Sequence, residues 1–270
     1  MRGTSSPRST TSTGGTVDSV VSTHEPGGGL TVPTYRDSGV VLRTHKFGEA
    51  DRVVVILTRE HGKVRAVARG VRKTRSSIGA RLEPMSHVDV SLRSGRDLDT
   101  VAEVRLVENH PRVRADLARV QQGLSMVEAV DKMTPDREPV PEIHEMLVKG
   151  LRTLDTDPSP LVLGAFFLRL LALEGRAPSL AGCLRCGARE GRFVFDVDEG
   201  GVMCPSCGPG QPVSDAAIRL MRAILSGRVR DALAEGDTAA AGETSAIAMD
   251  AMEHHLERRL RALGSFDRHL

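Results

Sequence analysis

The spacing of apolar residues changes near Pro111 and divides the chain into a front and a back region. In the front region apolar residues run together or alternate in short segments, which is the period of β-strands. Several of these segments are rich in β-branched residues, which favour strands. The pattern predicts strands over Gly39–Arg43, Val53–Leu57, Lys63–Arg69, Val88–Leu92 and Ala102–Leu106.

Five short strands with a long strand-free segment, residues 70–85, between the third and the fourth are typical of an OB-fold barrel. A small SH3-like barrel is the closest alternative. OB-folds bind oligonucleotides on the face of strands two and three and on neighbouring loops. We therefore expect an α+β protein in which residues 35–112 form an OB-fold nucleic-acid-binding domain.

Behind Pro111 apolar residues recur at every third or fourth position, which is the period of amphipathic helices. Residues 161–173 are apolar almost all round except for Arg169, and their length is too short to span a bilayer, so they predict a buried central helix. We expect residues 113–270 to form a helical domain. The predicted helices cover residues 113–130, 142–154, 161–173, 214–226 and 244–263.

Four cysteines interrupt the helical region in the pattern C-x2-C-x17-C-x2-C. Each C-x-x-C turn directs two thiolates at one centre, and the 17 residues between the pairs include a strand-like segment at 192–196. This spacing predicts a zinc-ribbon-like element at residues 180–212 that holds one structural Zn²⁺ on four thiolates. A redox dithiol is the alternative, and two pairs at ribbon spacing disfavour it. The predicted ligands are Cys183, Cys186, Cys204 and Cys207.

Charge separates the same two regions. Residues 35–112 carry 16 Lys and Arg against 10 Asp and Glu, whereas residues 113–270 carry 19 against 23. The stretch from His61 to Leu82 contains no acid. Its Lys and Arg side chains repel one another, and a neighbouring polyanion relieves this repulsion. With Tyr35 and Phe47 as the only aromatic residues in the front domain, we expect backbone-dominated, sequence-independent DNA binding. The predicted DNA-binding residues are Lys63, Arg65, Arg69, Arg72, Lys73, Arg75 and Arg81.

Residues 1–34 are expected to form a disordered tail, because 23 of the 34 are Ser, Thr, Gly or Pro and little apolar surface is available for burial. The chain has no apolar run of about 18 residues and no apolar segment typical of a signal peptide. We therefore expect a cytoplasmic protein that has no membrane contact and that associates with the nucleoid when it binds DNA.

Catalytic motifs are absent from the sequence: it has no G-x-x-x-x-G-K-[ST], H-E-x-x-H or G-x-S-x-G. The chain is therefore expected not to be an enzyme. The residues leave open an RNA-binding or transcription-associated OB/zinc-ribbon factor, and an enzyme that uses its cysteines for redox chemistry or metal-dependent hydrolysis.

Three stretches also resemble a known family. They are similar to the bacterial RecO family of DNA repair and recombination proteins, in its actinobacterial form. The first stretch is residues 35–84, with the GEADR turn and the strand HGKVRAVARGVR; the second is LRLLALEGRAPSLAGCLRCG, and the third is HLERRLRAL near the end. The resemblance covers about residues 35–263 and excludes the tail.

The resemblance implies an OB-fold, a helical domain and a zinc element. It further implies a mediator of homologous recombination in the RecF pathway that binds single- and double-stranded DNA, anneals complementary strands and helps load RecA on DNA coated by single-strand-binding protein (SSB). The implied partners are RecR and the acidic C-terminal tail of SSB, which the family binds in an apolar, basic-rimmed pocket of the helical domain. Arg169 is the one candidate for that pocket.

Overall fold

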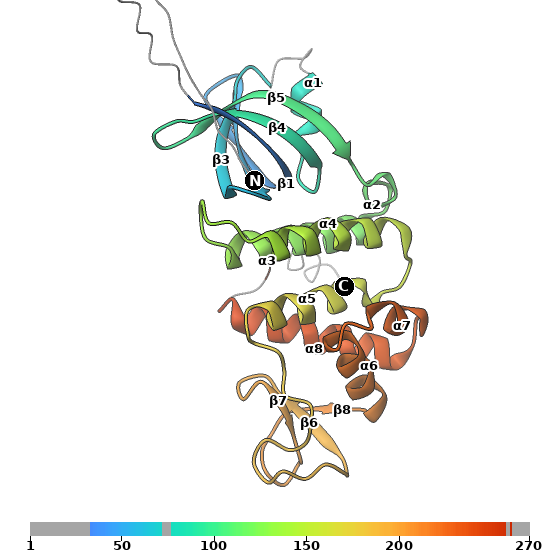
Figure 1. The fold of residues 1–270 in the computed structure, drawn as a ribbon. Helices are drawn as coiled ribbons and strands as arrows, with labels where there is room; N and C mark the ends of the chain where they lie inside the picture. Colours follow the sequence, from blue (N-terminus) through green and yellow to red (C-terminus); the bar gives the residue numbers. More distant parts are fainter. Residues whose placement is uncertain (1–32, 72–76, 258–259, 261–270) are drawn as a thin grey trace, which may run out of the picture. The chain divides into compact units, whose positions relative to one another are not determined.

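The structure is a computed structural model that describes residues 33–71, 77–257 and 260. Its front part is a closed barrel (Figure 1). The order of its strands is β1-β2-β3-β5-β4. β3 and β5 pair in parallel, and the other neighbours pair antiparallel. This arrangement confirms the predicted OB-fold. The barrel consists of β1 (Thr34–Phe47), β2 (Asp51–Thr58), β3 (Gly62–Ala68), α1 (Ser77–Arg81), β4 (His87–Arg93) and β5 (Asp99–Glu108).

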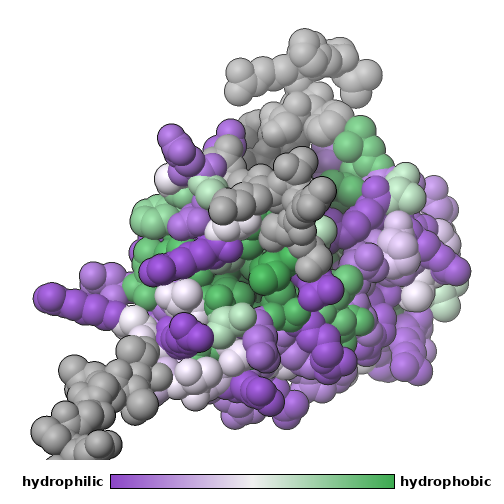
Figure 2. All heavy atoms as spheres, turned by 90° about the horizontal axis from the view of Figure 1, so that it is seen from above, coloured by the Kyte–Doolittle hydropathy of each residue, from purple (hydrophilic) through white to green (hydrophobic). Residues whose placement is uncertain are grey.

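A long first strand closes the barrel. Its first half pairs with β4 and its second half with β2, and Gly39 pairs with both at the crossing. A Cβ on Gly39 would lie 2.6 Å from Cγ2 of Ile56, so the close approach of the strands requires glycine there. Val, Ile, Leu and Ala side chains fill the interior. Seen from above, apolar side chains gather in the middle of the face and hydrophilic ones surround them (Figure 2).

The back part is helical, as predicted. Its centre is α5, with ten buried residues, which packs against α4, α6 and α8. Pro160, immediately before α5, and Pro141, at the first position of α4, suit helix starts, where an amide hydrogen is not needed. The helices are α2 (Pro111–Ala115), α3 (Leu117–Met133), α4 (Pro141–Thr156), α5 (Leu161–Leu173), α6 (Asp215–Leu225), α7 (Val229–Ala234) and α8 (Ala239–His255).

Between α5 and α6 the chain forms a small three-stranded sheet in the order β7-β6-β8. The strand expected between the two cysteine pairs is present as β6 (Phe193–Asp196), and β7 (Gly201–Met203) and β8 (Gln211–Val213) pair with it antiparallel. A guanidinium nitrogen of Arg222 on α6 donates to the carbonyl of Leu180 at 3.1 Å and ties this element to the helices.

The single helix predicted over residues 113–130 is wrong. Asp116 has an extended backbone and its carboxylate accepts from the amide of Arg119 at 3.0 Å, so it caps α3 and separates α3 from α2. As a result Leu117, expected on the apolar face, is 62% exposed. The last helix begins at Ala239, five residues earlier than predicted, and its predicted end lies outside the described residues.

The barrel and the helices share one hydrophobic cluster. Val40 and Leu42 on β1 and Val55 and Leu57 on β2 point away from the barrel interior and belong to the core that α3, α4 and α5 build. Among the described residues, no helix is long and apolar enough to cross a membrane.

Candidate nucleic-acid interface and metal centre

The outer face of β1, β2 and β3 is divided into two halves. Near the β2–β3 turn it is covered by the helical domain. There Lys63 on β3 is buried, and its ammonium donates to the carbonyl of Asp131 at 2.6 Å and lies 3.5 Å from the carboxylate of the same residue. Asp136 supplies a second carboxylate at 3.3 Å. Lys63 was expected on the DNA-binding surface with the arginines, but the structure places it in the contact between barrel and helices.

The α3–α4 connection strengthens the same contact. The amide of Arg137 donates to the carbonyl of Lys63 at 2.9 Å, and its guanidinium donates to Asp99 at 2.9 Å. The hydroxyl of Tyr35 also donates to Asp99, which is fully buried. Asp99 at the start of β5 thus joins the barrel to the α3–α4 connection through an ionic bridge. Gly62 lies against the connection with φ of 68°, and a Cβ there would lie 2.1 Å from the carbonyl oxygen of Glu138.

The half of this face near the β1–β2 turn, here called the free half, is exposed at His45 and Phe47 on β1. Arg65 and Arg69 are exposed there, and neither guanidinium has a hydrogen bond or ion pair within the described part of the chain. Arg81 lies on α1 and donates to the carbonyl of Val104 at 3.1 Å, so part of its donor capacity is used inside the barrel. The predicted residues Arg72, Lys73 and Arg75 lie outside the described residues.

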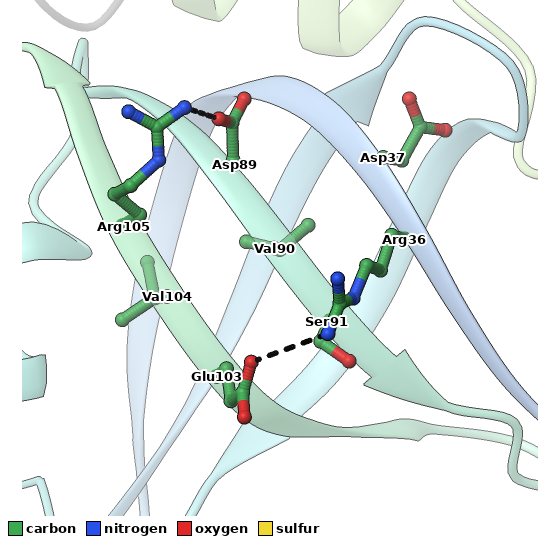
Figure 3. A pocket seen from close by; sticks show the side chains of 8 residues that line it. All are labelled: Arg36, Asp37, Asp89, Val90, Ser91, Glu103, Val104 and Arg105. Atoms are coloured by element: carbon green, nitrogen blue, oxygen red, sulfur yellow. Dashed lines mark hydrogen bonds and ion pairs between the residues drawn. The ribbon is translucent and has the colours of Figure 1, made fainter.

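A second outer face, on β1, β4 and β5, has a different charge pattern. It contains a depression of about 750 Å³ (Figure 3). Arg36 pairs with Glu103 at 3.9 Å, Arg105 pairs with Asp89, and Asp37 adds a further acid. Because acids neutralise both arginines, this face has no surplus of positive charge for phosphates.

Three histidines lie where the barrel meets α2 and α4. The rings of His87 and His144 are 6.2 Å apart, and His110 precedes α2 with φ of 52°. Within the part of the chain that the structure describes, Nδ1 of His87 and Nε2 of His110 and His144 are buried without a hydrogen-bond partner. Burial, helped by the neighbouring His87, lowers the pKa of His144 to about 4. Burial also lowers the pKa of His87 and of His110, so all three imidazoles are neutral at pH 7.

The four cysteines converge as the spacing predicts. Their Sγ atoms all lie within 4.8 Å of one another, and within the described residues they are the one group of this kind that could hold a metal ion. Each pair sits in a tight turn: the amide of Gly187 donates to the carbonyl of Cys183, and the amide of Cys207 donates to the carbonyl of Cys204, both at 2.9 Å.

Electrostatics at the cluster favour a cation. Amide hydrogens of Cys186 and Cys204 hold the pKa of the Cys183 thiol at about 5, whereas the neighbouring thiols of Cys204 and Cys186 raise the pKa of Cys207 to about 12. Crowded thiols cannot all become thiolates without a positive charge between them. The donor set and its closeness therefore fit a four-thiolate metal site with no place for water, which is the structural kind.

A groove of about 1370 Å³ runs along α4, α5 and α7. Phe166, Val162 and Leu233 supply an apolar part, and Arg169 lines it while donating to the carbonyl of Leu225 at 3.1 Å. Arg228 and Arg230 at the start of α7 add two cations. The sequence singled out Arg169 alone, because α7 was not predicted and its arginines could not be placed beside α5.

Comparisons with known proteins agree with these features. Residues 32–110 match the family model described as "Recombination protein O N terminal", and residues 114–264 match "Recombination protein O C terminal". The chain is 44% identical over 243 residues to the DNA repair protein RecO of Frankia casuarinae and 43% identical over 249 residues to that of Cutibacterium acnes. Each alignment covers 88% of this chain and 100% of the relative. The resemblance noted in the sequence is confirmed, and the chain belongs to the RecO family of DNA repair and recombination proteins.

Proposed function

We propose that this protein is a non-enzymatic recombination mediator of the RecF pathway. It binds single- and double-stranded DNA, anneals complementary strands and helps load RecA on DNA coated by SSB, with RecR as a partner. One observation carries the proposal: a family match over both domains coincides with an OB-fold whose outer face presents Arg65 and Arg69, which have no hydrogen bond or ion pair among the described residues. Such a protein works in the cytoplasm, at the nucleoid.

The proposed DNA-binding surface consists of Arg65 and Arg69 on the barrel, with Arg81 at its edge and Arg72, Lys73 and Arg75 in the segment between them. Two side chains fixed on a strand can hold a phosphate backbone in register, and contacts of this kind carry no sequence information. Lys63 is left out because its ammonium is buried against Asp131.

The groove along α4, α5 and α7 is the proposed docking site for the acidic C-terminal tail of SSB. An apolar part suits the hydrophobic residues of such a peptide, and Arg169, Arg228 and Arg230 suit its carboxylates. Lys149 and Arg152 also line the groove but pair with Glu145 and Glu108, both at 2.7 Å, which leaves less of their charge for a peptide.

The cysteine cluster is proposed to bind one structural Zn²⁺ through Cys183, Cys186, Cys204 and Cys207. The ion would join the two turns and stabilise the small sheet, because binding free energy at such a site is folding free energy.

Annealing of complementary oligonucleotides, with and without SSB, tests the function. The full chain should accelerate annealing, and the Arg65→Ala/Arg69→Ala double variant should lose most of this activity while Arg219→Ala, an exposed arginine on α6, retains it. A wild-type protein that neither binds DNA nor anneals it would rule the proposal out. Preferential binding of RNA over DNA would favour an RNA-binding role.

A further inference from the structure

The free half of the β1–β2–β3 face carries an exposed aromatic side chain. Phe47 ends β1, directly before the turn at residues 48–50, and is 48% exposed. Single exposed apolar residues are common on protein surfaces and need no function. The neighbours of Phe47 on the same face decide whether this one has a ligand.

Strand register identifies those neighbours. His45 pairs with Val53, Val53 pairs with Val67, and Phe47 pairs with Asp51. Residues directly opposite each other in a sheet share a face, and so do residues two apart along a strand. Phe47 therefore lies on the same outer face as His45 and as Arg65, which is two residues from Val67 along β3. Arg69, two residues after Val67, lies on the same outer face.

A hydrogen bond fixes the end of this surface. The amide of Gly70 donates to the carboxylate of Asp51 at 2.7 Å, so the residue after Arg69 is held at the start of β2, beside the β1–β2 turn. Arg69 is thus kept near the strand end that carries Phe47. The surface combines an exposed ring with two guanidinium groups that have no partner within the described chain.

This combination matches the chemistry of single-stranded nucleic acid. An unpaired base stacks on an aromatic ring, whatever its identity, and the flanking phosphates bind arginine. A base inside a duplex is already stacked on its neighbours and is not available to the ring. An aromatic contact added to phosphate contacts therefore distinguishes single strands from duplex, which the arginines alone do not.

We propose that Phe47 stacks on an unpaired base of single-stranded DNA whose phosphates bind Arg65 and Arg69. The inference rests on the proposed function and goes beyond it by assigning the preference for single strands to one ring. It also gives annealing a direction: when two strands pair, the base leaves Phe47 for its partner, and the duplex is then held by phosphate contacts alone.

Fluorescence anisotropy with a labelled oligothymidine and with a duplex of equal length, across a salt series, tests the inference on the full chain. Phe47→Leu removes the ring and keeps an apolar side chain, and Phe47→Tyr keeps a ring. Stacking of one base is worth about 1–3 kcal/mol, so Phe47→Leu should weaken single-strand binding about 5- to 150-fold. Its salt slope and its duplex affinity should not change, and Phe47→Tyr should bind like the wild type.

Leu117→Ala serves as the matched control, because Leu117 is also an exposed apolar residue and lies on α3. Thermal unfolding of each variant shows that the fold is retained. Wild-type affinity of Phe47→Leu for the single strand, or an equal loss on single strand and duplex, would overturn the stacking role and leave the proposed function intact. Absence of DNA binding by the wild type would overturn both.

Discussion

Lys63→Met separates a role in the fold from a role in DNA binding. The side chain of Lys63 is 10% exposed, and its ammonium contacts the carbonyl and the carboxylate of Asp131 as well as Asp136. Asp131 lies in the last turn of α3, where carbonyls have no partner within the helix. Methionine keeps the length and apolar character of the side chain and removes the charge, so its effect reports on these polar contacts.

The loss of unfolding free energy in Lys63→Met depends on the partners that Asp131 and Asp136 retain. Removal of one partner from a fully buried ion pair costs about 3–5 kcal/mol. Asp131 retains Arg43 at 2.5 Å, and the side chain of Asp136 is 58% exposed and keeps its water. The main remaining loss is the unpaired carbonyl of Asp131, which costs about 1–3 kcal/mol. We expect a loss of about 2–3 kcal/mol of unfolding free energy and, at about 2–4 °C per kcal/mol in a domain of this size, a fall in Tm of about 4–12 °C.

Thermal unfolding and DNA binding measured on the same preparations decide the matter. Lys63→Met should lower Tm and leave the salt dependence of DNA binding unchanged. Arg65→Ala should leave Tm nearly unchanged, because exposed substitutions change stability by about 0.5 kcal/mol or less, and should reduce the salt dependence of DNA binding. A Lys63→Met protein with unchanged Tm and a smaller salt slope would refute the assignment and return Lys63 to the DNA surface.

Three further predictions concern other parts of the molecule. The pKa of His144 is about 4 in the fold and 6.5 in the unfolded chain, so the unfolded chain takes up a proton first as pH falls. The free energy of unfolding should therefore be full above pH 6.5 and should fall by up to about 3 kcal/mol as pH drops to 4. Urea unfolding at several pH values should show this loss, and His144→Leu should reduce it. Purified protein should contain one zinc per chain by elemental analysis, and Cys204→Ser should lower both zinc content and Tm; full wild-type Tm in metal-free protein would contradict a structural ion. The Arg228→Ala/Arg230→Ala double variant should bind an SSB tail peptide at least about tenfold more weakly in calorimetry, because charge-assisted hydrogen bonds are lost. Its DNA binding should stay at the wild-type level. A peptide affinity equal to that of the wild type would place the tail elsewhere.

The sequence predicted the elements that are encoded locally. Runs of β-branched residues and alternation identified the five barrel strands. Helical spacing identified α4 and α6, a short segment that is apolar almost all round identified α5, and the two C-x-x-C pairs identified the cysteine cluster. Each of these signals depends on residues close together in the chain or on a ligand spacing that a known type of site imposes.

Long-range packing was not encoded in such patterns. Lys63 reads as one more cation in a basic run, and its partner Asp131 lies 68 residues away on a helix that the period alone did not place against β3. No local pattern pairs Asp99 with Arg137 either, because Arg137 lies 38 residues away in a proline-rich connection. The break at Asp116 was missed because the apolar period continues through it while its side chain caps α3.

The salt dependence of single-strand binding tests the central claim most directly. The logarithm of the binding constant should fall linearly with the logarithm of salt concentration, and loss of two phosphate contacts in Arg65→Ala/Arg69→Ala should make the slope shallower by about 1.4 units. Arg219→Ala should keep the wild-type slope. A slope for the double variant equal to that of the wild type would contradict the account, because it would show that the free face of the barrel does not bind the DNA backbone.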